Sequence, residues 1–443
     1  MCSSAAPRWR RSSTWSPSRW SSRRRPRDRR TCSTRADGGP GAGVPRDSAV
    51  TGNPPRPSPA RIHSLDALRA VMMLLGLVLH TALSYVPELS SGEWPYQDRQ
   101  ASDGFGWLVS LIHTFRMPAF FAVAGFFAAF LVERRGTGAF LRHRLSRIGV
   151  PLAGGWILLF PLTAVAWVLA ASRSGVPLAP GPGPEAGGFD LMHLWFLYQL
   201  LILSAAAALF RSAFLRFWPV GARRLADVAR KLLARRWAFL VLVGITALTL
   251  APMEAWELET DGTLLPPLRL LLAHGVFFIF GWLEHGRGGS FGHLRDRCLA
   301  RLGGGLFFHT LYLAVVVPYI GMAPVEAPFA HGAGMALLAA SMWLFVLGFL
   351  GLFRRWLDAP SPGWRYLSDA SYWMYLVHLP LTVALPPLLA GWDGPGLIKF
   401  ALALGVASAI TLVTYHYGVR STWVGKRLNG RRYPRVFPRR AST

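Results

Sequence analysis

Ten long apolar runs dominate this sequence of 443 residues, and they limit the folds that it can adopt. Each run has about 17–25 residues, the length that an α-helix needs to cross the hydrocarbon core of a bilayer. A helix also satisfies its backbone hydrogen bonds within one segment, as a lipid-exposed segment must. The runs cover residues 65–86, 107–131, 148–171, 191–210, 237–253, 267–285, 304–321, 333–353, 370–390 and 397–418. The sequence therefore predicts an all-α polytopic membrane protein, a bundle of about ten transmembrane helices.

The connections between these runs alternate in charge. Those after the first, fifth and seventh runs are mostly acidic, and those after the second, fourth, sixth and eighth hold clusters of arginine. Cytoplasmic connections of membrane proteins are enriched in Lys and Arg. Ten helices with both termini inside place every arginine cluster in the cytoplasm, whereas an odd number would break the alternation. We therefore expect both termini to be cytoplasmic.

The net charge of +26 is concentrated at the two ends of the chain. The first 60 residues hold 13 Arg against three Asp, and residues 420–443 hold eight Arg or Lys and no acid. Such basic flanks are typical of a membrane protein and argue against nucleic acid as a partner. We expect a disordered Arg/Pro/Ser-rich tail over 1–60, a transmembrane domain over 61–418 and a basic cytoplasmic tail over 419–443. Alternatively, translation starts further along and residues 1–60 are not made.

The first apolar run carries three ionisable residues, Asp66, Arg69 and His80. A charge at membrane depth costs about 2.5–3.5 kcal/mol for Arg or Asp at a helix centre, so such residues call for an explanation. Arg69 and His80 share one helix face, about 16 Å apart along its axis. Asp66 and Arg69 can neutralise each other at i,i+3. The alternative is that the charged pair snorkels and His80 makes a hydrogen bond in helix packing.

The segment LDALR, followed by the spacing Arg69-x10-His80, resembles the first transmembrane helix of the membrane-bound acyltransferase-3 family. Four later segments resemble that family in order: HTFRMPAFFAVAGFF from His113, RHRLSRIGVPL from Arg142, HLWFLYQLL from His193 and SYWMYLVHLPL from Ser371. The resemblance covers residues 61–418 and is nearest to the branch containing glucan biosynthesis protein C. It implies that His80 is the catalytic base and that Arg69 orients or neutralises a group in the catalytic site. An imidazole can take a proton from a hydroxyl near neutral pH.

Two pairs of basic residues follow on the second run and after it. His113 and Arg116 lie three residues apart, and apolar neighbours predict that Arg116 faces the bundle interior, where it contacts substrate or forms an ion pair. Arg144 and Arg147 match the family's cytoplasmic arginine motif, which implies contacts to the phosphates of a coenzyme A donor. Without the resemblance they read as membrane anchors. The family often has Ser-Gly where this chain has Ala124-Gly125, so no hydroxyl is expected there.

Further candidates for substrate binding lie on the fourth and ninth runs. His193 and Trp195 open the fourth run, on the outer side in the expected topology, although an interfacial aromatic belt also explains the tryptophan. Tyr375 and His378 form a polar strip on the ninth run, either a site wall or helix-packing contacts. Asp66 completes the predicted substrate-binding set. No group of Cys or His has metal-ligand spacing, so no metal is expected.

The resemblance implies an enzyme of the bacterial inner membrane that moves an acetyl- or succinyl-type group. The expected donor is a cytoplasmic acyl-CoA used as co-substrate, with no tightly bound cofactor, and the acceptor is a hydroxyl of an extracytoplasmic glycan. The lipid bilayer is the other expected partner. A transporter or flippase for an anionic or glycan substrate is the alternative, and an inactive membrane scaffold is a second one.

Overall fold

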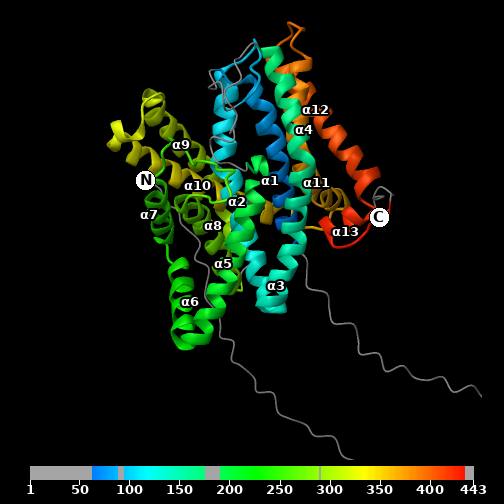
Figure 1. The fold of residues 1–443 in the computed structure, drawn as a ribbon. Helices are drawn as coiled ribbons and strands as arrows, with labels where there is room; N and C mark the ends of the chain where they lie inside the picture. The colour runs from blue at the N-terminus through cyan, green and yellow to red at the C-terminus, as the bar shows by residue number, and fades with distance from the viewer. Residues whose placement is uncertain (1–61, 88–93, 175–189, 289–290, 435–443) are drawn as a thin grey trace, which may run out of the picture. The chain divides into compact units, whose positions relative to one another are not determined.

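The computed structural model describes residues 62–87, 94–174, 190–288 and 291–434, so the predicted tail over 1–60 lies outside it. Over these ranges the chain is helical and forms no strand (Figure 1). The α-helices are α1 (His63–Ala82), α2 (Asp103–Arg135), α3 (Thr137–Arg144), α4 (Val150–Ser174), α5 (Trp195–Phe217), α6 (Pro219–Leu233), α7 (Ala238–Leu250), α8 (Leu268–Gly286), α9 (Cys298–Val316), α10 (Pro328–Trp356), α11 (Pro362–Leu388), α12 (Gly396–Thr414) and α13 (Trp423–Asn429). Short helical turns join or extend them: η1 (Leu83–Tyr85), η2 (Leu145–Gly149), η4 (Met192–Leu194), η5 (Gly292–Arg297), η6 (Val317–Tyr319), η7 (Pro324–Glu326) and η8 (Tyr415–Val419).

Within the described ranges, eight helical segments are long and apolar enough to cross a membrane. They are His63–Tyr85, Asp103–Arg135, Thr137–Ser174, Met192–Phe217, Leu268–Gly286, Gly292–Tyr319, Pro328–Trp356 and Gly396–Val419. They correspond to eight of the ten expected runs, and the prediction of a helical, multi-pass membrane protein is confirmed. The orientation of the termini stays a prediction.

The other two expected runs have a different form. The run 237–253 becomes α7, with 13 residues, and it follows α6 across a bend of 110°, so the two helices together make at most one further span. The run 370–390 belongs to α11, which has 27 residues and is about 40 Å long. It is long enough to cross, but polar side chains along it lower its hydropathy.

The interior of the bundle is built on close helix pairs. α1 packs along α11 and α2, and α9 packs along α10. α2 approaches α8 most closely at two glycines: a Cβ on Gly125 would lie 1.9 Å from the carbonyl oxygen of Phe278, and one on Gly281 would lie 1.7 Å from that of Ala122. Small residues allow such contacts between membrane helices.

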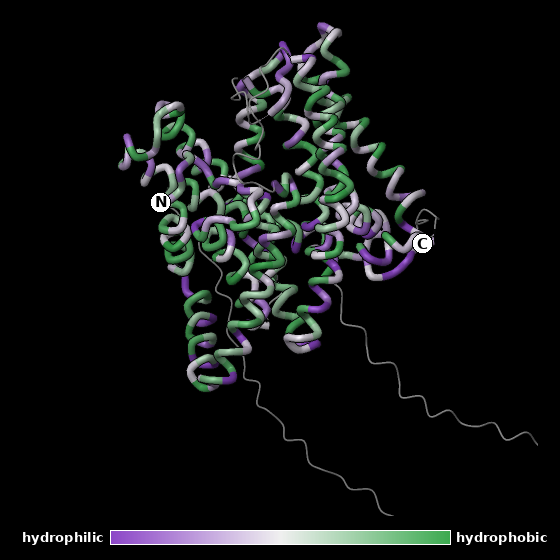
Figure 2. The backbone as a smooth tube through the Cα atoms, in the orientation of Figure 1, coloured by the Kyte–Doolittle hydropathy of each residue, from purple (hydrophilic) through white to green (hydrophobic). Residues whose placement is uncertain are grey.

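Hydrophobic residues occur along much of the long helices, as the green stretches of the tube in Figure 2 show, and many of their side chains are exposed. On α4, the side chains of Ile157, Val165 and Leu169 are exposed by 69%, 59% and 59%. Large exposed apolar surfaces mark contacts with lipid or with other proteins. This outer surface is suited to the hydrocarbon core of a bilayer.

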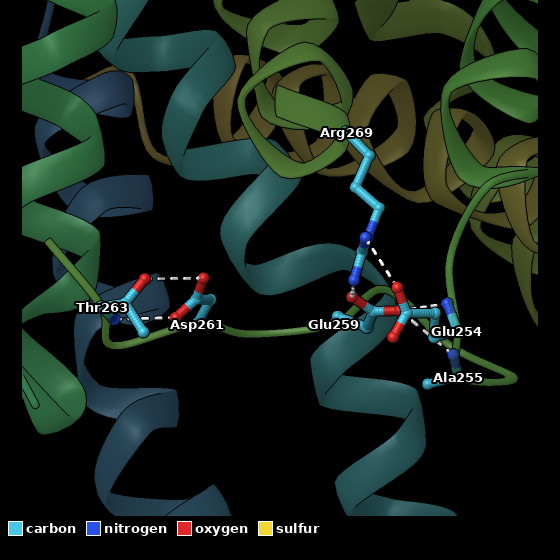
Figure 3. A network of polar contacts seen from close by, with 6 residues as sticks. All are labelled: Glu254, Ala255, Glu259, Asp261, Thr263 and Arg269. Atoms are coloured by element: carbon cyan, nitrogen blue, oxygen red, sulfur yellow. Dashed lines mark hydrogen bonds and ion pairs between the residues drawn. The ribbon is translucent and has the colours of Figure 1, made fainter. Parts of the chain in front are cut away.

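The acidic connection between α7 and α8 is held by a set of ion pairs, drawn in Figure 3. Arg269 contacts Glu254 at 2.9 Å and Glu259 at 3.1 Å. The carboxylate of Glu259 also accepts hydrogen bonds from the backbone N–H groups of Glu254 and Ala255. These bonds fix the short stretch that carries Glu257.

Candidate functional site

Three histidines from distant parts of the chain meet near the C-terminal end of α1. His80 lies in the last turn of α1, His193 in η4 and His378 in the middle of α11. The ring centroids of His80 and His378 are 5.1 Å apart, and those of His378 and His193 are 5.0 Å apart. The packing of α11 along α1 brings His80 and His378 together. The three predicted histidines therefore form one cluster, which we call the imidazole cluster.

Backbone carbonyls fix the rings of two of these histidines. His378 Nδ1 lies 2.5 Å from the carbonyl oxygen of Tyr375, and His193 Nε2 lies 3.0 Å from that of Leu376. A ring nitrogen that contacts a carbonyl oxygen must carry the hydrogen when the imidazole is neutral, which leaves the other nitrogen as an acceptor. His378 Nε2, His193 Nδ1 and His80 Nδ1 are all buried without a hydrogen-bond partner. The cluster thus presents unused ring nitrogens, as proton transfer requires.

The predicted residue Tyr375 supports this cluster rather than facing an open site. Its hydroxyl donates a hydrogen bond to the carbonyl oxygen of His193 at 2.6 Å, and its ring lies 5.5 Å from the imidazole of His193. The bond ties α11 to η4. Tyr375 therefore fixes the position of His193.

Arg116 joins the imidazole cluster from α2, at a place that Gly76 leaves open. A Cβ on Gly76 would lie 2.6 Å from Arg116 Nη1 and 3.7 Å from His378 Nε2. Arg116 Nε is buried without a hydrogen-bond partner, and within the described ranges no carboxylate pairs with this guanidinium. A buried and uncompensated cation is costly to maintain. Its position beside the imidazoles suits it to an anionic group on a reactant.

A short stretch before α2 covers one face of the His80 ring. The indole ring of Trp94 stacks on the imidazole of His80, with centroids 5.9 Å apart and an angle of 20° between the rings. Trp94 Nε1 donates a hydrogen bond to the Ser84 hydroxyl at 2.9 Å. Only 6% of Trp94 is exposed, so this side chain forms part of the wall.

An ion pair buried on both sides anchors this covering stretch, residues 94–100, to α12. Lys399 Nζ lies 3.1 Å from each carboxylate oxygen of Asp98, and the two side chains are exposed by only 2% and 1%. Asp98 also accepts hydrogen bonds from the Tyr96 hydroxyl and from the backbone N–H of Gln100, both at 2.9 Å. Burial and the bond to Asp98 raise the pKa of Tyr96, so its phenol stays protonated and donates.

A second polar site lies toward the opposite end of α1, at a cavity of about 330 Å³. Arg69, Arg144 and Arg147 all line it, so the structure brings together the arginines that the sequence predicted separately. Tyr372 and Asn429 add polar groups to its wall, and several phenylalanines line the rest. Cationic side chains beside an apolar lining suit a ligand with phosphates and an uncharged part. We call this space the arginine cavity.

The arginines of this cavity differ in how they are held. Arg147 Nη1 donates a hydrogen bond to the carbonyl oxygen of Arg427 at 2.9 Å, and its own carbonyl oxygen accepts one from Tyr372 at 3.0 Å. Arg144 stacks on Phe140, and its Nε and Nη2 are buried without hydrogen-bond partners. Arg144 is therefore the arginine whose donors are available to a ligand, whereas Arg147 is partly used for packing.

The inner end of the arginine cavity approaches the imidazole cluster. Met73 on α1 and Phe120 on α2 line the cavity. Met73 precedes Gly76 by three residues, and Phe120 follows Arg116 by four, so each pair is separated by about one helical turn. A ligand in the cavity therefore reaches toward Arg116 and the histidines.

Three predicted residues lie outside both sites or at their edge. His113 contacts Glu257 at 3.4 Å, and Trp195 stacks on the buried ring of His274 with centroids 5.6 Å apart. Asp66 lies 3.6 Å from Arg69, as the i,i+3 spacing predicted. Their roles in substrate binding stay predictions.

Sequence reasoning missed Gly76, Trp94 and the pair of Asp98 with Lys399. Only the pair left a usable signal: a lysine at the start of an apolar run requires a carboxylate partner. The predicted tail over 419–443 is also more than a tail, because α13 packs beside η2 and contributes Leu428 and Asn429 to the arginine cavity.

The helical, membrane-spanning architecture and the two polar sites along α1 define a multi-pass membrane protein with a buried site suited to group transfer. The Acyltransferase domain family, acyltransferase-3, matches residues 62–416. This chain belongs to that family, and it is a membrane acyltransferase.

Curated relatives agree with this assignment. Glucans biosynthesis protein C of Salmonella heidelberg strain SL476 is 25% identical to this chain over 379 residues, which cover 82% of this chain and 93% of the relative. The protein of the same name from Salmonella typhi has the same identity and coverage. The predicted resemblance is thereby confirmed. No solved structure matches the chain.

Proposed function

We propose that this acyltransferase moves an acyl group, of the acetyl or succinyl type, from a cytoplasmic acyl-CoA to a hydroxyl of an extracytoplasmic glycan. The observation that carries the proposal is the arrangement along α1: an arginine cavity at one end and the imidazole cluster with Arg116 at the other. The printed name of the relatives, glucans biosynthesis protein C, supports a glycan as the acceptor. The bacterial inner membrane is the proposed location.

In the proposed reaction, His80 takes the proton of the acceptor hydroxyl, and the resulting oxygen attacks the thioester carbonyl. Arg116 stabilises the negative charge that develops on the carbonyl oxygen, as a preorganised cation does in a water-poor site. The carbon–sulfur bond then breaks, the acyl ester forms, and the CoA thiolate receives the proton. His378 adjoins His80 and His193 adjoins His378, which provides a polar path for that proton.

The donor is proposed to lie in the arginine cavity. Guanidinium groups form short, charge-assisted hydrogen bonds to phosphate oxygens. Arg144 offers free donors for this purpose, and Arg69 lies on the same wall. The thioester end of the donor then points along α1 toward Arg116.

The experiment measures thiol release from acetyl-CoA and succinyl-CoA by the purified full-length protein in proteoliposomes, with glucan oligosaccharides as acceptors. The wild-type protein should consume one of these two donors and acylate the oligosaccharide. His80→Ala should reduce the rate by about 10²–10⁴, the usual contribution of a general base. Donor affinity, measured separately, should stay near the wild-type value.

His331→Ala is the matched control, because His331 is also buried but contacts Trp256, away from the cluster. This variant should keep most of the activity. Equal rates for His80→Ala and wild type would refute the proposed role. A transporter, the alternative predicted above, would bind or move substrate without releasing any thiol.

A further inference from the structure

A strongly basic cavity, separate from the arginine cavity, lies where the α6–α7 bend meets the end of α8 and the start of α9. Its volume is about 460 Å³. The basic side chains that line it are Arg235, Arg236, Arg287, His293, Arg297 and Arg301. Among the described residues, Glu284 is the only acidic one that lines this cavity. The proposed acyl transfer uses none of these residues.

The positive charge of this cavity is largely uncompensated. Glu284 is 1% exposed and pairs with Arg287, while its other carboxylate oxygen lies 3.9 Å from His293 Nε2. Arg301 Nη1 donates to the carbonyl oxygen of Leu294 at 2.6 Å. Five guanidinium groups thus line the cavity with one carboxylate, and Asp296, outside the lining, adds one further negative charge near Arg301. Such a surplus attracts an anion, and the planar guanidinium group suits phosphate oxygens in particular.

An apolar groove of about 790 Å³ adjoins this basic cavity. α5, α6, α7 and α8 form it, and among the residues placed by the structure Arg211 is the only charged one in its lining. The two spaces share four lining residues: Leu233, Ala238, Leu242 and Phe280. A single ligand with an anionic head and an apolar chain would therefore contact both spaces at once.

We propose that the basic cavity and the adjoining groove bind an anionic phospholipid, with the phosphate among the arginines and an acyl chain along the groove. The arginine-rich side of a membrane protein is the cytoplasmic side, so the lipid comes from that leaflet. Anionic lipids of the cytoplasmic leaflet are attracted to basic residues next to membrane helices. The surplus of arginine over carboxylate selects an anionic head rather than a zwitterionic one.

The test titrates full-length protein in detergent with dioleoyl-phosphatidylglycerol or dioleoyl-phosphatidylcholine and counts bound lipids by native mass spectrometry. We expect phosphatidylglycerol to bind at least about tenfold more tightly. The double variant Arg235→Ala/Arg297→Ala should lose about tenfold or more of this affinity, because charge-assisted hydrogen bonds to the phosphate are removed. Equal affinity for the two lipids in the wild type would overturn the proposal.

The double variant Arg223→Ala/Arg295→Ala is the matched control. It removes the same charge from α6 and η5, at exposed arginines that do not line the cavity. Its affinity for phosphatidylglycerol should equal that of the wild type. Equal losses in both double variants would show a general effect of charge and would also overturn the proposal.

Two further arms separate a lipid from a soluble phosphate. sn-Glycerol 3-phosphate should fail to displace phosphatidylglycerol at equal concentration. Gly275→Leu should weaken lipid binding by filling the groove, because a Cβ there has its nearest neighbour, Leu203 Cδ2, at 3.7 Å. Full displacement by glycerol phosphate, with no effect of Gly275→Leu, would assign the cavity to a soluble anion and reject the lipid.

Discussion

Gly76 is the residue on which the position of the Arg116 guanidinium depends. The hydrogen atom of this glycine leaves room for Arg116 Nη1 beside His378, one turn before His80 on the same helix. The lack of a side chain at this position is therefore part of the site's chemistry. We therefore expect a substitution there to affect the proposed reaction through Arg116 rather than the fold.

We predict that Gly76→Ala lowers the rate of transfer about 10²–10³-fold, with little change in thermal stability. The added methyl group displaces only the end of a flexible side chain, but it removes the cation from the developing charge, a loss comparable with that of one oxyanion donor. Thiol release and the unfolding temperature measure the two effects. Gly405→Ala on α12 is the control, because a Cβ there has no neighbour within 4 Å. Unchanged turnover in Gly76→Ala would contradict the role given to Arg116.

Arg144 is predicted to contribute more to donor binding than Arg147. Arg144→Ala should weaken acyl-CoA binding about ten- to a hundredfold, the worth of a lost charge-assisted hydrogen bond. Arg144→Lys should restore only part of it, since an ammonium group keeps the charge but lacks the planar fork. Isothermal titration with acyl-CoA measures both variants. Arg142→Ala, at an exposed arginine outside the cavity, should bind normally; a loss there as large as in Arg144→Ala would refute the assignment.

The sequence predicted those site residues that a single helix or a local motif brings together. Arg69 and His80 are related by helical periodicity alone, and Arg144 and Arg147 by a short motif. The contact of His80 with His378 depends on how two distant helices pack, which periodicity does not specify. The unpaired state of Arg116 could not be predicted either, because α1 and α8 carry Asp66 and Glu284 and only the packing of the described helices shows that neither pairs with it.

At the scale of elements, the site depends on irregular segments as much as on straight helices. η2 is a π-helical turn between α3 and α4, and it carries Arg147. Turns of this kind are frequent at functional sites because they change the direction in which side chains project. The apolar pattern predicted the span but not this turn, and it missed the bend between α6 and α7 for the same reason.

We predict that the folded position of residues 94–100 depends on the buried ion pair of Asp98 and Lys399. Lys399→Met should lower the free energy of unfolding by about 3–5 kcal/mol, because it leaves Asp98 buried without its partner. The double variant Asp98→Leu/Lys399→Met should be more stable than Lys399→Met, since it removes both buried charges. Thermal unfolding in detergent, followed by tryptophan fluorescence, measures the difference. A double variant less stable than Lys399→Met would contradict the claim that the unpaired charge of Asp98 causes the loss.

At the scale of the whole molecule, the orientation in the membrane decides which reactant reaches which site. In the orientation that we predict from the alternating loop charges, the arginine cavity would contact the cytoplasm and the imidazole cluster would lie toward the outside. The donor and acceptor would then approach α1 from opposite sides. The protein would carry an acyl group across the membrane as part of the reaction.

Single cysteines at Val325 and Gly391 should react with an impermeant thiol reagent on intact cells, whereas cysteines at Gly138 and Arg223 should react only after permeabilisation. Each position is exposed, and a Cβ at Gly138 or Gly391 has no neighbour within 4 Å. The background chain carries Cys2→Ser and Cys32→Ser, while Cys298 is buried. Labelling of Gly138→Cys on intact cells would reverse the orientation.

If the arginine cavity holds the acyl-CoA, as we propose, the contribution of α13 to it would set the order in which the enzyme becomes active during its synthesis. Leu428 and Asn429 line the cavity, and the carbonyl oxygen of Arg427 holds Arg147. These residues follow all the candidate membrane spans of the described residues. A nascent chain whose spans have all been inserted would still have an incomplete donor site. Acyl-CoA could therefore not be engaged before the hydrophobic part of the protein is fully assembled in the bilayer.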